Sequence, residues 1–527
     1  MRLVGAPPSS IGKFGGDTDN WVWPRHTGDF SLFRIYAGKD NKPAPYSQSN
    51  VPYKPKRSLS ISTKGIKEGD FTMVFGFPGR TQQFLTSFAV KQIVDQENPN
   101  KIELRAKRLE IMGADMAADP RVRIMYSAKY ASVANAWKKW IGEAKGLKEV
   151  RGVEDKEFQE VNFSRWANGD AERAKLYGSL IPQFQKLYEE YTPLVKSRDY
   201  FREAIGAVEL LRVANSYGTW ATRFQKKGSF TSADSIKLRE FGEFVQSFYK
   251  DYNLLTDRKI FSAMVGSYLE NAPAQYVPAN LLAEYQKSPS FVDSLTESIF
   301  SNTLFVDSTK SKLLWANMDT TAAKMILDDP AVSLYNEIFV VYDKGVTANL
   351  GRIEKELDLA YRKYVKAQME MEKDKIFYPD ANSTLRVAFG KVSGFTPRDG
   401  VEYKYYTTLD GVIEKDNPDI YDYNVTEKLK SLYRARDFGN YAKNGQLHVA
   451  FIGTNHTTGG NSGSPVLNAK GELVGINFDR AWEGTMSDIQ FDSDRCRNIA
   501  LDVRYALFLI DKYAGATWLL NEMKIVK

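Results

Sequence analysis

Two serines lie in a glycine-rich stretch near the C-terminus, and either has the chemistry of a nucleophile. Residues 459–466 read GGNSGSPV, with Ser462 and Ser464 among the glycines. A nucleophilic serine needs a tight turn that exposes its hydroxyl, and backbone N–H groups directed at the developing oxyanion. The glycines permit such a turn, and the N–H groups of Gly460 and Ser462 have a suitable spacing. Because Gly- and Ser-rich hairpin turns are common, this stretch alone leaves a plain turn equally open.

An aspartate near the N-terminus shifts the balance toward catalysis. The stretch HTGDFSLFRI (26–35) places Asp29 at the head of an expected strand. The same Asp-apolar-small-Leu pattern occurs in trypsin-like peptidases. The chain order, Asp29 before Ser462, fits the chymotrypsin arrangement of a serine triad. The two residues together favour a hydrolase.

The elements that must position these residues fall into three zones. Residues 1–83 and 381–527 contain short apolar runs separated by glycine, proline and threonine, which is typical of strands. Between them, apolar residues recur three or four apart, which predicts helices. A β-rich unit is therefore interrupted by a helical insertion. The expected strands are 29–38, 70–79, 384–392, 447–454 and 472–479, and a helix over 498–523 is expected to close the chain.

Composition excludes several classes of function. The chain has 527 residues and a formal charge of +7 from 72 basic and 65 acidic side chains, too weak a field to indicate nucleic-acid binding. Its single cysteine, Cys496, allows no intrachain disulfide or cysteine-based zinc site. No run of 18 apolar residues suggests a membrane span. No metal cluster or phosphate-binding loop is visible, so no cofactor is expected.

Several motifs along the whole chain carry a family resemblance. They are SSIGKFGGDTDNWVWPRHTGDFSLFR, FTMVFGFPGRT, YASVANAWKKWIG, FYPDANSTLRVAFG and GGNSGSPVLNAKGELVGINFDR, followed by WEG. The sequence resembles the bacterial dipeptidyl-peptidases of the chymotrypsin clan, a family that includes dipeptidyl-peptidase 7 and, closer in its motifs, the Asp/Glu-specific dipeptidyl-peptidase 11. The resemblance implies a serine exopeptidase that releases dipeptides from peptides with a free N-terminus through an acyl-enzyme.

The resemblance also implies a fold and a setting. It is a mixed β and α fold: a chymotrypsin-like double β-barrel into which a large α-helical cap domain is inserted. Residues 1–83 would be the remainder of the N-terminal barrel, 84–380 the cap, and 381–527 the C-terminal barrel with the nucleophile and a terminal helix. The resemblance implies a periplasmic or cell-surface location in a Gram-negative bacterium, and a homodimer is suggested by the family only.

The resemblance assigns the catalytic groups residue by residue. Ser462 matches the nucleophile, and Ser464 becomes a neighbouring turn residue. Asp29 matches the residue that orients the catalytic histidine. The N–H groups of Gly460 and Ser462 match the oxyanion hole.

Four further residues match the groups that hold the substrate's free α-amine. They are Asn20, Trp21, Asn135 and Asp479. This assignment makes physical sense because an ammonium needs carboxylate and amide acceptors, with an aromatic face to close the cleft. Without the resemblance, Asn135 would be read as a polar residue on an amphipathic helix.

Arg480 bears most directly on the substrate. In this family the position 18 residues after the nucleophile shapes the pocket for P1, the residue on the N-terminal side of the cleaved bond. Glycine there goes with apolar P1 residues, and arginine goes with Asp or Glu. A guanidinium pairs with a carboxylate through two hydrogen bonds. Arg480 therefore predicts an acidic P1, with an apolar P1 preference or a solvated arginine as alternatives.

The general base is the missing part. The chain has three histidines, His26, His448 and His456, and none matches the family's catalytic histidine. Each is expected to be structural or to line a pocket. We therefore expect an N-terminally truncated member of the family that lacks significant triad catalysis. An inactive homologue that only binds peptides is the alternative.

Overall fold

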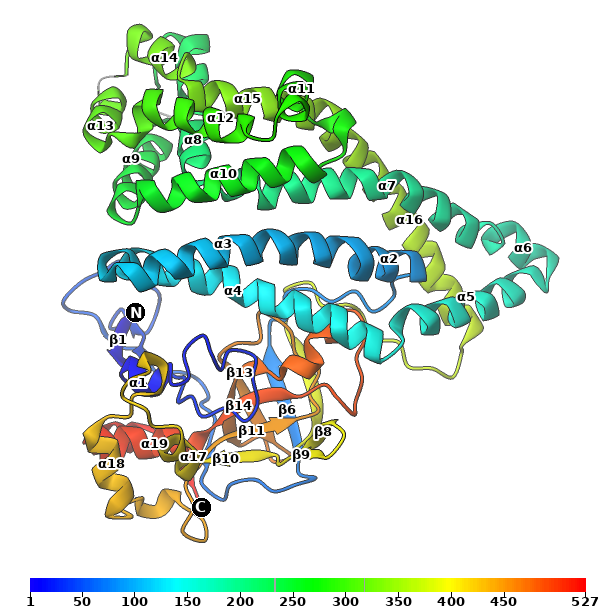
Figure 1. Ribbon diagram of the computed structural model, residues 1–527. Coiled ribbons are helices and arrows are strands. Elements are labelled where there is room, and N and C mark those ends of the chain that lie inside the picture. The colour runs from blue at the N-terminus through cyan, green and yellow to red at the C-terminus, as the bar shows by residue number, and fades with distance from the viewer. Residues whose placement is uncertain (232–233, 317) are drawn as a thin grey trace. The chain divides into compact units, whose positions relative to one another are not determined.

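The computed structural model, shown in Figure 1, describes residues 1–231, 234–316 and 318–527. The chain divides into two compact units. Unit 1 comprises residues 1–84, 142–150 and 376–527, and unit 2 comprises residues 85–141 and 151–375. The fold class is mixed, with strands in unit 1 and helices predominating in unit 2.

Unit 1 is built on strands from both ends of the chain. They are β1 (Arg2–Gly5), β2 (Leu32–Arg34), β3 (Tyr36–Ala37), β4 (Val51–Pro52), β5 (Ile61–Ser62), β6 (Phe71–Gly76), β7 (Arg386–Lys391), β8 (Phe395–Arg398), β9 (Val401–Tyr403), β10 (Tyr406–Thr408), β11 (His448–Gly453), β12 (Ser464–Asn468), β13 (Leu473–Arg480), β14 (Asn498–Asp502) and β15 (Ile525–Val526). Its helices are α1 (Ser9–Gly12), α17 (Leu409–Glu414), α18 (Glu427–Arg434) and α19 (Val503–Phe508).

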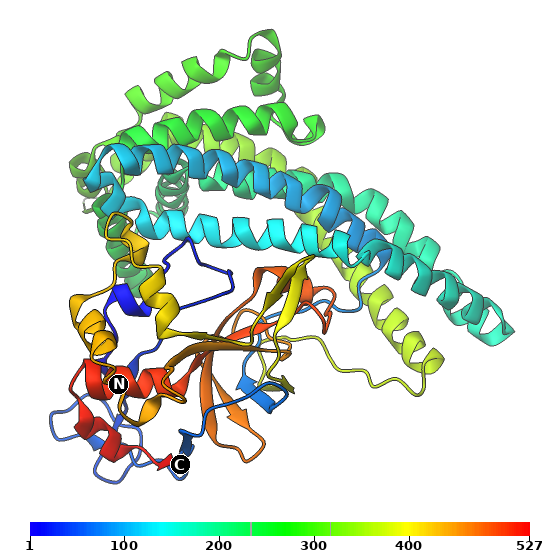
Figure 2. The same ribbon diagram turned by 60° about the horizontal axis from the view of Figure 1, so that its bottom comes forward.

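One sheet dominates unit 1, and Figures 1 and 2 show its strands from two directions. Its order is β10-β11-β14-β13-β12-β6-β7, with neighbours antiparallel. The short strand β5 adds to β13 in parallel and also pairs with β15. The sheet therefore places the end of β13 next to the start of β12, where the serine turn lies.

The helical insertion leaves and re-enters this sheet at neighbouring strands. β6 and β7 pair from Phe71 opposite Lys391 to Gly76 opposite Arg386. Beyond them, the carboxylate of Asp380 accepts hydrogen bonds from the Thr81 hydroxyl (2.7 Å) and the Gln83 N–H (2.9 Å). The insertion thus replaces what would otherwise be a hairpin loop. The strands predicted at 70–79, 384–392, 447–454 and 472–479 are confirmed.

The prediction of one helix over 498–523 is wrong: the segment begins with a strand, and its helical part is interrupted at residues 514–516. Residues 498–502 form β14, a fully buried strand between β11 and β13. A short apolar run has the same pattern in a buried strand as in a buried helix, so periodicity does not separate the two. The helix α19 begins only after Asp502, whose carboxylate accepts a hydrogen bond from the Arg504 N–H at 2.9 Å. The expected strand at 29–38 is likewise broken into β2 and β3.

Unit 2 is formed by long helices. They are α2 (Ser87–Gln92), α3 (Asn98–Ala118), α4 (Pro120–Glu149), α5 (Gly152–Asn168), α6 (Ala171–Tyr177), α7 (Leu180–Glu203), α8 (Glu209–Lys227), α9 (Ser235–Lys250), α10 (Leu254–Asn271), α11 (Ala279–Lys287), α12 (Phe291–Asn302), α13 (Ser308–Ala316), α14 (Thr320–Leu327), α15 (Pro330–Tyr342) and α16 (Ala348–Met371). The last residues of α4, 142–149, belong to unit 1.

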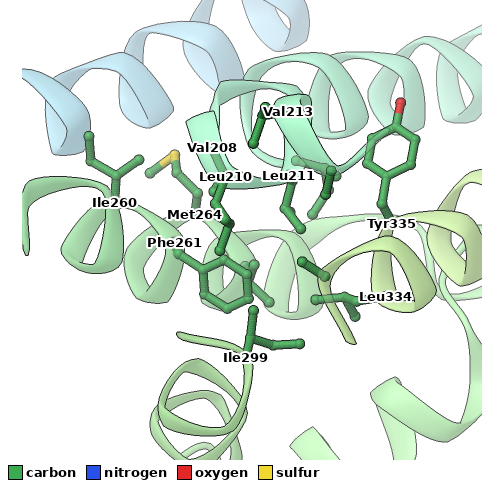
Figure 3. Packing of buried hydrophobic residues seen from close by; sticks show 14 of the residues in the cluster. Val208, Leu210, Leu211, Val213, Ile260, Phe261, Met264, Ile299, Leu334 and Tyr335 are labelled. Atoms are coloured by element: carbon green, nitrogen blue, oxygen red, sulfur yellow. The ribbon is translucent and has the colours of Figure 1, made fainter. Parts of the chain in front are cut away.

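A continuous apolar core joins helices of unit 2, among them α3, α4, α8, α10, α12 and α15. Figure 3 shows Leu210 of α8, Phe261 of α10, Ile299 of α12 and Leu334 of α15 gathered in it, all of them buried. Burial of such side chains is the main term that stabilises a helical unit of this kind. Within the described ranges, none of the helices has the length and apolarity needed to cross a bilayer.

Candidate functional site

Ser462 lies on the turn that connects β11 to β12, and its side chain is exposed. The turn is fixed from beneath by hydrogen bonds to β13. The Gly463 N–H donates to the Asn477 carbonyl (2.7 Å), and the Asn477 side-chain amide donates to the Asn461 carbonyl (3.2 Å). The Ser462 hydroxyl itself lies 3.4 Å from the Phe478 carbonyl oxygen. A rigid turn thus presents this hydroxyl beside the end of β13.

Ser464 has a different environment. It begins β12 and is buried, with its hydroxyl packed so closely against β6 that a side chain at Gly76 would clash with it. Its N–H donates to the Asn461 carbonyl at 3.0 Å. Of the two serines, Ser462 is the one that a substrate can reach.

The backbone N–H groups at this turn are available. In the part of the chain that the structure describes, neither the Gly460 N–H nor the Ser462 N–H donates a hydrogen bond to the protein. Free N–H donors beside an exposed serine are what an oxyanion hole requires.

The conformation at Gly460 leads to a stability prediction. Its φ is +103°, and a Cβ there would clash with the Phe77 carbonyl oxygen and lie 2.9 Å from the Gly79 nitrogen. We expect Gly460→Ala to lower the free energy of unfolding by at least about 1–3 kcal/mol. Gly459→Ala is the matched control because a Cβ there meets nothing within 4 Å. Urea denaturation of both variants checks this; equal stability would show that the turn is not strained.

Asp29 lies ahead of β2 in unit 1, with its side chain reaching solvent. The pKa of Asp29 is raised, mainly because the surrounding protein removes part of the hydration of its carboxyl. The positive charge of Arg25 opposes this shift, and the negative charge of Asp479 adds to it. Among the described residues, no hydrogen bond joins Asp29 to Ser462 or to a histidine.

Two of the histidines are packed into the interior of unit 1. His26 is buried, with its ring against Gly411. Burial, helped by the positive charge of Lys415, lowers the pKa of His26 to about 3. His448 is stacked on Tyr406 with 4.2 Å between ring centroids, and burial lowers its pKa to about 4. Both rings are therefore neutral at physiological pH and engaged in packing.

His456 is nearer to the serine in sequence but points elsewhere. Its Nε2 lies 2.8 Å from the Ser487 carbonyl oxygen, and its ring packs on Phe491 with 4.7 Å between centroids. Burial lowers its pKa. No histidine nitrogen within the described ranges hydrogen-bonds to the Ser462 hydroxyl.

This arrangement predicts weak turnover by the 527-residue chain. Because no histidine takes the proton of Ser462, we expect Ser462→Ala to change the hydrolysis rate of a fluorogenic dipeptidyl amide by less than about tenfold, since a serine without its base adds little to the residual rate of about 10³–10⁴ over water. A loss of hundredfold or more would reveal a working base and direct attention to His26 or His456.

Asp479 lies near the end of β13 and is the centre of a buried cluster. Its Oδ2 accepts hydrogen bonds from Arg25 Nη1 at 2.8 Å and from the Trp21 N–H at 3.3 Å. Its Oδ1 accepts one from the Arg480 N–H at 2.9 Å. Trp21 has a φ of +68°, which is uncommon for a residue with a side chain. The half-buried Asn20 precedes it. Arg25 is a partner that sequence reasoning missed.

The loop that carries Asn20 and Trp21 is anchored at its base. The Asp19 carboxylate accepts hydrogen bonds from Tyr423 and from Lys415, both at 2.8 Å, and the Asp19 carbonyl accepts one from Arg25 Nη1 at 2.8 Å. The loop is therefore held by buried charges, and the Trp21 N–H is fixed toward Asp479.

Arg480 is 5% exposed and its positive charge is already paired. Its Nη1 and Nη2 donate to the two carboxylate oxygens of Asp488 at 2.7 and 3.0 Å. Nη1 also lies 2.6 Å from the Ser487 hydroxyl and 3.3 Å from the Thr457 carbonyl oxygen. The guanidinium lies 5.6 Å from the centre of the Trp21 ring. Burial by itself would lower the pKa of Arg480. The negative charge and hydrogen bonds of Asp488 have the larger combined effect, so the pKa of Arg480 is raised.

The structure thus brings most of the predicted site together within unit 1. Trp21, Asp479 and Arg480 are in mutual contact, and the Ser462 hydroxyl meets β13 one residue before Asp479. Asn135 lies on α4 in unit 2. The pairing of Arg480 with Asp488 was not foreseen, since nothing in the sequence links the two residues. No group of His, Cys, Asp and Glu side chains among the described residues is placed to hold a metal ion.

Comparisons with known proteins agree on a family. A sequence profile for "Peptidase S46" matches residues 1–525. An "Asp/Glu-specific dipeptidyl-peptidase" of Flavobacterium psychrophilum is 46% identical over 528 residues, covering 100% of this chain and 73% of that protein. A "dipeptidyl-peptidase 7" of Phocaeicola vulgatus is 39% identical, covering 100% of this chain and 72% of that one.

The fold has a counterpart among solved structures. The crystal structure of Porphyromonas endodontalis DPP11 in complex with the dipeptide Arg-Glu matches with a TM-score of 0.87 and 37% identity, covering 100% of this chain and 74% of that one. The resemblance found in the motifs is therefore confirmed. The chain belongs to the peptidase S46 family.

Proposed function

We propose that this protein is a serine-type dipeptidyl-peptidase that recognises Asp or Glu at P1. The observation that carries the proposal is a buried arginine next to an exposed serine. Arg480 follows Phe478 by two positions on β13, and the Phe478 carbonyl meets the Ser462 hydroxyl. Relatives named as Asp/Glu-specific dipeptidyl-peptidases support the same substrate class.

In this proposal Ser462 attacks the carbonyl carbon of the P1 residue, and a serine ester forms as the peptide bond breaks. The negative charge of the tetrahedral intermediate is received by the N–H groups of Gly460 and Ser462. Water then hydrolyses the ester and releases the dipeptide. Asp29 would orient the histidine that removes the proton of Ser462. That histidine is not one of the three in this chain, for the geometric reasons above.

The length of the product would be set by recognition of the α-amine. Within unit 1, Asp479 supplies a carboxylate, Trp21 an aromatic face and Asn20 an amide oxygen, and the family resemblance adds the amide of Asn135. An ammonium held at a fixed distance from Ser462 places the second peptide bond at the nucleophile. Free N-termini would therefore be required.

A panel of dipeptides tests the proposal without any need for turnover. We expect dipeptides that end in Asp or Glu to raise the melting temperature of the chain more than those that end in Asn, Gln, Leu or Phe, because a ligand that binds the folded state stabilises it. A larger shift with Leu- or Phe-ending dipeptides would overturn the acidic preference.

A peptide-binding protein without catalysis is the second candidate. The absence of hydrogen bonds from His26, His448 or His456 to Ser462 within the described ranges favours it. It predicts the same dipeptide preference and the same small effect of Ser462→Ala that we expect for the 527-residue chain, whereas a loss of hundredfold or more would favour the enzyme.

The finer fold and the setting are part of this proposal. The β-rich unit would be the chymotrypsin-like double barrel, and the helical unit its cap. An exposed apolar face on β6 and β7, made by Phe71, Phe75, Val387 and Phe389, suits strands that pack on a second β layer. A periplasmic location and a homodimer rest on the resemblance alone; cell fractionation and light scattering test them.

A further inference from the structure

Arg480 uses only one of the two edges at which a guanidinium binds a carboxylate. Asp488 occupies the edge formed by Nη1 and Nη2. The other edge is formed by Nε and the outer N–H of Nη2. Among the described residues, no acceptor lies at the Arg480 Nε, although this atom is fully buried. A buried charged donor without a partner is costly unless a ligand supplies the acceptor.

A second buried arginine in the same unit shows the contrast. Arg504 binds Asp502 through Nε at 2.9 Å and Nη2 at 2.6 Å, which fills the edge that Arg480 leaves open. Both arginines are buried and both are paired with an aspartate. Three arginines of unit 2, Arg108, Arg173 and Arg223, also have a buried Nε without an acceptor. Among the described arginines of unit 1, Arg480 is the one with this feature, and its place beside Ser462 points to a second carboxylate.

The charges around Arg480 then make Asp488 a competitor of that carboxylate. The carboxylates acting on Arg480 are Asp488, bound directly, and Glu143. The Arg480–Asp488 pair is already neutral, so a bound P1 carboxylate adds an uncompensated negative charge. Two carboxylates on one buried cation repel each other strongly. The same neutral pair lets an uncharged P1 side chain bind without exposing a bare cation to an apolar contact.

On the strength of the proposed function, we propose that Asp488 determines how strictly the P1 pocket selects acidic residues. The P1 carboxylate binds at the Nε–Nη2 edge of Arg480, while Asp488 stays on the Nη1–Nη2 edge. Repulsion between the two carboxylates then limits the affinity for an acidic P1 residue. Asp488 is therefore a residue that tunes specificity through Arg480. A residue with a merely structural role, holding Arg480 in place, would act in the opposite direction.

Calorimetric titration of the whole chain with the dipeptides Arg-Glu and Arg-Gln separates these roles. The two ligands differ only in the charge at P1. We expect Asp488→Asn to raise the ratio of the two affinities, acidic over neutral, by at least about tenfold, from tighter Arg-Glu and weaker Arg-Gln binding. A ratio that stays the same or falls overturns the proposal, because Arg480 would then need Asp488 to bind the acid.

Asp502→Asn is the matched control. It damages an equally buried pair in the same unit, and the affinity ratio is expected to stay within twofold of the unchanged protein. A change as large as that of Asp488→Asn would mean that general destabilisation moves the ratio, and would overturn the assignment.

A crystal structure of the unchanged chain with Arg-Glu tests the geometry even if the Asp488 variant does not fold. The P1 carboxylate is expected on Nε and Nη2 with Asp488 still bound; a P1 carboxylate that displaces Asp488 overturns the proposal. The failure of the proposed function has a different signature. If the unchanged chain binds Arg-Glu no better than Arg-Gln, acidic recognition itself is wrong, and this inference falls with it.

Discussion

Arg480→Met is expected to abolish the preference for acidic dipeptides and to destabilise unit 1 by about 3–5 kcal/mol. The selectivity is lost because the cation that binds the P1 carboxylate is gone. The stability is lost because Asp488 keeps its largely buried charge and loses the guanidinium that lies 2.7 Å away in the unchanged protein. Calorimetric titration with Arg-Glu and Arg-Gln measures the first effect, and urea denaturation the second.

A double variant separates these two effects. Arg480→Met combined with Asp488→Leu removes both charges, and apolar replacement of a buried ion pair is often neutral or stabilising. We therefore expect stability to recover while the preference for Arg-Glu stays lost. If the double variant regained the preference, Arg480 would not be the group that reads the P1 residue.

Asp479→Asn is expected to weaken binding of Arg-Glu by about a hundredfold or more, the effect of removing one partner of a buried, hydrogen-bonded charge pair. The asparagine oxygen can still accept a hydrogen bond from the Arg480 N–H. Its NH₂ group then faces Arg25 and the Trp21 N–H, which are themselves donors, so these hydrogen bonds are lost. The charge of Arg25 would then be left facing the incoming ammonium. Titration with Arg-Glu and with N-acetyl-Arg-Glu measures the result.

The acetylated ligand is the control for this prediction. The unchanged protein should bind the free amine much more tightly than the acetylated form, and Asp479→Asn should bind both equally weakly. If the variant still distinguished the two, the α-amine would be recognised by other groups, and Asp479 would serve only to hold Arg25 and Trp21.

Local pattern was enough to predict most of the elements around the site. Strands such as β6, β11 and β13 are bounded by glycine, proline or polar residues, so the sequence pattern predicts where they end. β14 was mistaken for the start of a helix because it is buried on both faces and lacks alternation. What identifies it as a strand is its pairing with β11 and β13, which no local pattern reveals.

The sequence indicated which residues gather at the candidate site, but not which charged side chains pair with them. The glycines around Ser462 are a local signal for an exposed turn, and the structure has one there. The partners Asp488 and Arg25 were missed because each meets its charge only through tertiary folding; Arg25 lies 454 positions from Asp479 in sequence. Arg480 was predicted to pair with the carboxylate of an acidic P1 residue, and the structure already pairs it with Asp488.

We infer that the buried Arg480 near Ser462 binds a carboxylate at P1, and a single titration is the decisive experiment. The 527-residue chain is titrated with Arg-Glu and Arg-Gln in the same buffer. We expect Arg-Glu to bind at least about tenfold more tightly than Arg-Gln, the effect of one charge-assisted pair with a buried arginine. Equal affinity for the two dipeptides, or tighter binding of Arg-Gln, would contradict it.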